Sequence, residues 1–255
     1  MIYTCFDMIR DCRADRAEGW SYFVANYVPA ARALLEHYGG AALLERVLVA
    51  LRRPESSLFA SLDPSPERSF LAELRQHVLA ELDAPPPAIT LELEAVAAAL
   101  EPLTVTEKQA AWLETMRYSH ADSAAMLRMA PETVGKVRDR AAELLRGKVD
   151  AWNRDLLAAN GLALGRAAAA AAGKDCLPAR AFLDVLDGRA TWRDREEMER
   201  HVNRCWHCID HFCRVAEVNE LRRRSQPLAD AEAEPFRKLL GVPEAKRSAW
   251  KRWLG

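Results

Sequence analysis

Residues 201–208 read His-Val-Asn-Arg-Cys-Trp-His-Cys, and this stretch decides how the last third of the chain can fold. His201, Cys205 and Cys208 follow the spacing H-x3-C-x2-C. On one helical face, or on a helix end and the turn after it, an imidazole and two thiolates at this spacing can converge on one ion. A structural Zn2+ takes four nitrogen or sulfur ligands in a tetrahedron. The stretch therefore predicts a small helical domain held together by Zn2+.

The fourth ligand must come from outside these three residues, and Cys176, upstream in the sequence, is the predicted one. Three nearby residues compete for the position: His207, His211 and Cys213. The alternative interpretation is a set of ordinary buried cysteines beside a chance histidine, because reduced cysteine often packs as a small hydrophobe. Three of the six cysteines and three of the six histidines fall within residues 201–213, and this clustering favours the metal site.

The composition sets the class of protein to expect. The 255 residues are 50% hydrophobic, which is enough for one large core or two to three small ones. The formal net charge of −1 argues against a basic coat for nucleic acid, so any such contact would be a local patch. No run approaches the roughly 18 apolar residues of a membrane span, and the N-terminus lacks a signal-peptide layout. We expect a cytoplasmic protein without membrane contact.

Cysteine usage supports the same compartment. Six cysteines, half of them crowded into one cluster, suit a reducing environment better than a framework of disulfides. Cys5 and Cys12 lie far from the cluster in sequence, and we expect free thiols or core residues there.

Apolar residues recur at helical spacing in almost every segment, and no alternating strand pattern competes with them, so the sequence predicts an all-α fold. Three such stripes cover residues 23–35, 43–51 and 70–82. A run of prolines then breaks the chain as a stiff, extended linker. We expect a first helical domain at residues 1–83 and the linker at 84–90.

A second helical domain is predicted at residues 91–158. Thr104 followed by Glu107 forms a capping box that starts one helix. A short helix begins near Ser119, and Pro131 opens a longer one, at the first helical position where its missing N–H costs nothing. The order is therefore helix, short helix, tight turn, helix.

Helix signals also flank the cysteine cluster. Gly188 marks the end of one helix, and Thr191 with Asp194 forms a capping box that starts the next, which delivers His201. The remaining chain divides into an alanine-rich connector at 159–173, a zinc-binding domain at 174–224 and an amphipathic C-terminal tail at 225–255.

Residues 103–113 and 118–134 carry a resemblance to a known family. They read Leu-Thr-Val-Thr-Glu-Lys-Gln-Ala-Ala-Trp-Leu and Tyr-Ser-His-Ala-Asp-Ser-Ala-Ala-Met-Leu-Arg-Met-Ala-Pro-Glu-Thr-Val. This pattern resembles the C-terminal helix-turn-helix domain, region 4, of bacterial sigma factors, and it fits the extracytoplasmic-function group best. The match covers roughly residues 100–147. It implies a transcription-initiation factor that binds core RNA polymerase and promoter DNA and catalyses no reaction.

In that family the helix after the tight turn reads the promoter, and here it is matched by residues 131–147. Two positions depart from the family, because Arg128 stands where glycine is usual and Gly135 where a basic residue is usual. Residues 128–148 carry six cationic and three acidic side chains, a local charge of +3 (6 − 3), which gives modest attraction to phosphate. The residues predicted to contact DNA are Arg128, Glu132, Thr133, Lys136, Arg138 and Arg140. The alternative is a helical bundle with no role in DNA binding.

Residues 17–82 are similar in order and spacing to a degenerate region 2, the sigma domain that grips the polymerase clamp and melts the promoter. The resemblance implies that the helix at 43–51 faces the clamp and that Glu45 and Leu48 contact polymerase. Polar candidates for base or phosphate contact are Arg75, Gln76 and His77. The alternative is a helical scaffold or protein-contact domain.

Cys176 together with the H-x3-C-x2-C stretch resembles the zinc-binding anti-sigma fold, over roughly residues 174–224. In that family the small domain clamps onto a sigma factor, and some members release it when the thiolates are oxidised. Fusion to a sigma-like chain gives a high effective concentration, so the zinc domain would brace or gate its neighbours. Another sigma or anti-sigma protein is then a further candidate partner.

Two alternatives for the whole chain remain open. One is a zinc-binding, anti-sigma-like regulator that binds proteins and does not contact DNA. The other is a thiol oxidoreductase that uses Cys205 and Cys208, although that motif normally opens a helix in a β-α-β setting and no strands are visible.

Overall fold

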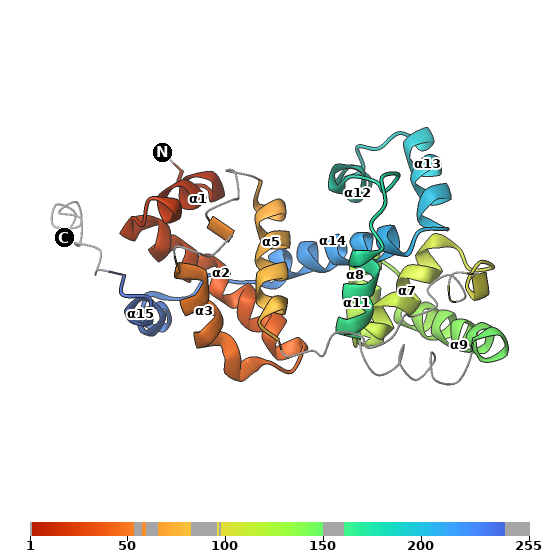
Figure 1. Cartoon of the computed structure of the whole chain (residues 1–255), viewed down its shortest axis with the longest axis horizontal. Helices are drawn as coiled ribbons and strands as arrows, with labels where there is room; N and C mark the ends of the chain where they lie inside the picture. The colour runs from red at the N-terminus through yellow and green to blue at the C-terminus, as the bar shows by residue number, and fades with distance from the viewer. Residues whose placement is uncertain are drawn as a thin grey trace. The chain divides into compact units, whose positions relative to one another are not determined.

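The computed structural model describes residues 2–53, 58–59, 66–82, 96, 98–149 and 161–242. The prediction of an all-α fold is confirmed, since the described residues form helices and turns and include no strand (Figure 1). None of their helices has the length and apolar character needed to cross a membrane. The predicted linker at 84–90 lies outside the described residues.

The chain divides into two compact units. Unit 1 comprises Met1–Asp83 and Leu221–Gly255, and unit 2 comprises Ala84–Glu220. The C-terminal residues therefore belong with the N-terminal ones.

Unit 1 is built on an aromatic and aliphatic core. The three predicted stripes lie on α2 (Ala17–His37), on the short helix η1 (Ala41–Leu43) with α3 (Leu44–Arg52), and on α5 (Glu67–Ala80), while α1 (Cys5–Arg13) precedes them. Cys5 and Cys12 are buried, in agreement with the sequence, and form no disulfide. The rings that meet in this core belong to Trp20, Phe23, Tyr27, Phe59 and Phe70.

The helix α15 (Asp230–Leu239) completes unit 1 by packing on α2 and α3. Just before it, the Leu228 N–H donates to the Ala25 carbonyl at 2.8 Å. The guanidinium of Arg32 lies over the Phe236 ring, 5.4 Å from its centroid, and Ala233 is fully buried. The predicted C-terminal tail thus contains a docked helix, and its residues after 242 lie outside the described part.

Unit 2 contains the predicted helix-turn-helix. It consists of α7 (Val105–Thr115), α8 (His120–Leu127) and α9 (Pro131–Lys148). The expected Thr104–Glu107 capping box, the Ser119 cap and the proline at the start of α9 are all present. Arg128 ends α8 in the left-handed conformation, with φ at 55°. Glycine would adopt this conformation without a steric cost, whereas residues with a side chain adopt it rarely.

The remaining helices of unit 2 are α11 (Gly161–Ala170), α12 (Ala179–Leu186), α13 (Trp192–Val202) and α14 (Trp206–Arg224), whose last four residues belong to unit 1. Gly188 follows α12 with φ at 71°, and the Thr191–Asp194 capping box starts α13, as predicted. One hydrophobic core joins these helices to the helix-turn-helix, with members such as Trp112, Phe182 and Trp206. Segments 91–158 and 174–224, which the sequence assigns to separate domains, therefore contribute to a shared core.

Candidate metal centre and its helix-turn-helix support

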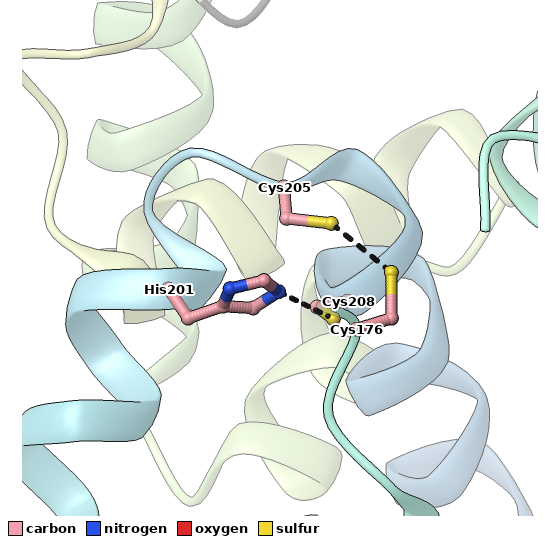
Figure 2. A group of neighbouring side chains, drawn as sticks. All are labelled: Cys176, His201, Cys205 and Cys208. Atoms are coloured by element: carbon pink, nitrogen blue, oxygen red, sulfur yellow. Dashed lines mark hydrogen bonds between the residues drawn. The ribbon is translucent and has the colours of Figure 1, made fainter. Parts of the chain in front are cut away.

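The four predicted ligands come together from two helices and two turns (Figure 2). Cys176 lies in the turn before α12, where its sulfur accepts the Gly173 N–H at 3.2 Å. His201 stands in the last turn of α13. Cys205 lies in the turn that follows, and Cys208 stands in the first turn of α14. The predicted break between α12 and α13 and the turn between α13 and α14 bring these side chains face to face, and this turn is one of the two arrangements that the spacing allowed.

The spacing of the four donor atoms fits a tetrahedral ion. All four lie within 4.8 Å of one another. The sulfurs of Cys176 and Cys205 are 3.7 Å apart, and Nε2 of His201 is 3.1 Å from the sulfur of Cys208. Zinc–sulfur bonds of about 2.3 Å at tetrahedral angles separate two sulfurs by roughly 3.8 Å, whereas a disulfide needs about 2.05 Å. The cluster can hold a metal ion, and its cysteines form no disulfide.

Burial of the two thiols of α14 and the turn before it affects their protonation, and therefore how they can bind a cation. Burial raises the pKa of Cys208 to about 12, although the Leu177 N–H at 3.4 Å acts in the opposite direction. Burial likewise raises the pKa of Cys205. A buried thiol releases its proton only when a nearby positive charge compensates the thiolate. Metal binding at this site is therefore expected to release protons.

The three competing residues lie outside the cluster. His207 is hydrogen-bonded through Nδ1 to the Ala168 carbonyl at 3.1 Å. The ring of His211 packs 5.1 Å from that of Phe182, and burial, with smaller effects from neighbouring cations, lowers its pKa to about 4. Cys213 is buried, with its sulfur 3.8 Å from the Gln109 carbonyl. The ligand set chosen from the sequence is thus the one that the structure brings together.

The segment that carries the candidate ligands contacts the helix-turn-helix through buried polar pairs, which the sequence did not predict. These pairs join α7 and the turn after it to α14 and the turn before it. A faint signal existed: Asp210 and Glu217 stand seven residues apart in a helix whose other buried residues are largely apolar. The pairs are Lys108 with Asn203, Trp112 with Asp210, and Tyr118 with Glu217.

Four of the predicted DNA contacts are exposed at the turn and at the start of α9: Arg128, Glu132, Thr133 and Lys136. Arg140 is also exposed, but it pairs with Glu107 of the capping box at 3.1 Å. Gly135 faces His120, whose ring would lie 3.5 Å from a Cβ added there.

Arg138 requires a correction, because its side chain is only 6% exposed. Its guanidinium donates to the Tyr118 carbonyl and to the Ser123 hydroxyl, both at 2.8 Å, and lies 3.7 Å from Glu114. It therefore holds the helices of the motif together, and we leave it out of the proposed DNA contacts. The side of α9 that carries Arg138 packs on α7 and α8.

The two residues predicted to contact polymerase also differ in exposure. Glu45 is exposed on α3, but Leu48 is fully buried in the core of unit 1 and offers no surface to a partner. Arg75 is 5% exposed and donates to the Tyr38 hydroxyl at 3.2 Å. Gln76 is exposed, and His77 is half-buried, which lowers its pKa.

A scan against protein-family models matches no family, and neither a curated protein nor a solved structure matches this chain.

Proposed function

We propose that this protein is a bacterial transcription-initiation regulator of the sigma type, which binds core RNA polymerase and promoter DNA and carries Zn2+ in the Cys176, His201, Cys205 and Cys208 cluster. The observation that carries the proposal is the joining of a helix-turn-helix and a Cys3His cluster in one hydrophobic core. Bound Zn2+ would supply the charge that keeps three thiols ionised and would tie α13, α14 and the turn before α12 together.

The shared core favours a brace over a gate. A gate must separate from what it controls, and its contacts are therefore small or solvated. Here the contacts of α14 include the fully buried indole of Trp112 and the buried carboxylates of Asp210 and Glu217. Separating these surfaces would expose a tryptophan and take one hydrogen-bond donor away from each of the two buried carboxylates. The zinc domain is accordingly expected to support the helix-turn-helix in its folded form.

Reconstitution tests the proposal. The zinc-loaded, reduced protein is mixed with core RNA polymerase and a pool of promoter DNA fragments from the source genome. We expect one zinc per chain, a complex with polymerase and initiation from a subset of the fragments. A protein that holds zinc yet forms no complex and starts no transcript would rule out the sigma-type function.

Lys136 allows the DNA-binding surface to be tested by itself. Lys136→Ala should weaken binding to all bound fragments alike and lower the salt slope of the affinity by about one, as expected for a phosphate contact. Lys174→Ala, which removes an exposed lysine outside the helix-turn-helix, serves as the matched control. Equal affinities for the two variants would exclude this face of α9.

A second function, a protein-binding regulator without DNA contact, is favoured by the charges on α9. Arg138 is buried and Arg140 is paired, so the exposed start of the helix presents Arg128 and Lys136 beside Glu132. This surface has little net positive charge. Capture of a sigma factor by a zinc-loaded protein that shows no DNA affinity at low salt would establish this alternative.

A further inference from the structure

Lys108 of the helix-turn-helix reaches the loop that carries the metal ligands. Its side chain, on α7, is only 1% exposed. The ammonium donates to the backbone carbonyl of Asn203 at 3.0 Å and also to the side-chain oxygen of the same residue. Asn203 caps the C-terminus of α13 and stands two residues from both His201 and Cys205. One lysine of the DNA-binding motif thus holds the turn between two ligands.

The placement of this cation has a physical reason. Both oxygens of Asn203 are neutral, and burial lowers the pKa of Lys108, so the site makes a charged lysine costly. The negative charge of Glu101 acts against this lowering of the pKa, and two further features would offset the cost in the same direction. The C-terminus of a helix carries partial negative charge, and a divalent ion bound by three thiolates and a neutral imidazole has a net charge of −1 (2 − 3). A buried ammonium beside them compensates both.

A second contact holds the same loop from α7. Trp206, between Cys205 and Cys208, packs against Trp112 with ring centroids 4.8 Å apart. Lys108 and Trp112 are four residues apart, so they lie on one face of α7. The ligand loop is therefore held from outside the ligand set at two points, one polar and one aromatic.

We propose that Lys108 is a positioning residue for the metal centre, which sets metal affinity and release rate through Asn203 and links metal occupancy to the first helix of the helix-turn-helix. The inference rests on the zinc site proposed above. Because coupling between two sites is reciprocal, the metal affinity gained from this contact equals the stabilisation that bound metal gives to α7. Residues that orient metal ligands from outside typically change metal affinity 10- to 100-fold when they are replaced.

The test compares two lysine-to-methionine variants of the full chain. Lys108→Met keeps the length of the side chain and removes its charge, and Lys238→Met makes the same change at an exposed position of α15 in unit 1. Zinc affinity is measured by competition with a chromophoric chelator, and zinc release by stopped flow. We expect a loss of affinity of roughly 10- to 100-fold and faster release for Lys108→Met, and wild-type values for Lys238→Met.

Asn203→Ala keeps the test valid if Lys108→Met does not fold. It removes the side-chain acceptor and leaves the backbone carbonyl, so it should weaken zinc binding in the same direction and by less. The double variant should bind zinc no more weakly than Lys108→Met alone, because both changes break one contact. A general loss of packing would instead make the two effects add.

The outcomes separate the two proposals. If the wild-type chain takes up no zinc, the zinc site itself is wrong. If the wild-type chain binds zinc and neither Lys108→Met nor Asn203→Ala alters its affinity or release, the zinc site stands and the positioning role of Lys108 is overturned.

Discussion

The two units bury different kinds of side chain. In the described part of unit 1 the core is aromatic and aliphatic, and its buried charged residues are Asp11 and Arg75. In unit 2 the same kind of core encloses Lys108, Asp210 and Glu217 among several other buried polar residues. Apolar cores tolerate rearrangement, whereas a buried polar pair is costly once one member loses the other. Unit 1 therefore depends mainly on bulk packing, whereas unit 2 depends on specific pairs and on the metal ion that we propose for its Cys3His cluster.

Removal of the bound metal should have the largest effect, and it should destabilise unit 2 but not unit 1. Structural zinc contributes on the order of 10 kcal/mol in small zinc-binding peptides, which is similar to the whole stability of a typical domain. After treatment with a chelator, backbone amides of α13, α14 and α7 should lose protection from hydrogen exchange, while those of α2 and α5 keep it. Hydrogen exchange read by mass spectrometry measures both units in one sample.

Readdition of zinc is the control for this experiment and should restore protection in unit 2. Cys205→Ser should reproduce the loss without a chelator, because serine is a poor ligand for zinc. Unchanged protection of unit 2 in the metal-free protein would show that its buried pairs suffice without the ion.

Truncating one large side chain in each core should have the next largest effect. Trp112→Ala removes the indole that packs on Trp206 and donates to Asp210 at 3.0 Å, and should cost about 3–5 kcal/mol. Phe23→Ala should cost a similar amount in unit 1. Each change should lower the urea midpoint of unfolding of its own unit. Hydrogen exchange at several urea concentrations measures the unfolding of each unit separately.

Trp112→Phe separates the contribution of the indole N–H from that of the ring. The ring remains large enough to fill most of the site, but the N–H that bonds Asp210 is lost, so an intermediate loss of stability is expected. Destabilisation of both units by either truncation would mean that they unfold together.

Local chemistry explains what the sequence could predict. The capping box at Thr104, the glycine after α12 and the proline that opens α9 each depend on a few neighbouring residues, and the structure has all three. The ligand set followed from the spacing at 201–208 and from the presence of a fourth cysteine. These features need no knowledge of how distant helices pack.

Packing between distant helices explains what the sequence could not predict. Lys108 meets a residue 95 positions away, and no local pattern links the two. Arg138 and Leu48 were wrong as contact residues because their helices pack against several neighbours, and neither a local sequence pattern nor a family resemblance shows this packing. For the same reason, the amphipathic pattern of residues 225–255 did not indicate that α2 and α3 would be the helices on which α15 packs.

A tyrosine-to-phenylalanine change made in each unit should give a smaller and unequal effect. Tyr118→Phe removes the hydroxyl that donates to the fully buried carboxylate of Glu217 and should cost about 1–3 kcal/mol. Tyr3→Phe removes a donor to Asp11, which keeps its bonds to Arg10 and Arg16, so the cost in unit 1 should be lower. Thermal unfolding with unit-specific probes measures the difference. Equal costs would contradict the idea that unit 2 depends more on its polar pairs.

The smallest expected effect concerns α15, where unit 1 has its own long-range attachment. Phe236→Ala removes the ring beneath the Arg32 guanidinium, a cation–π contact of about 0.5–2 kcal/mol. Ala233, Leu240 and Val242 remain buried around it, so α15 should fray and exchange its amides faster without unfolding α2. Leu239→Ala, at a partly exposed position of the same helix, is the control and should change little. Global unfolding of unit 1 by Phe236→Ala would show that α15 is essential to the core and that unit 1, like unit 2, depends on specific long-range contacts.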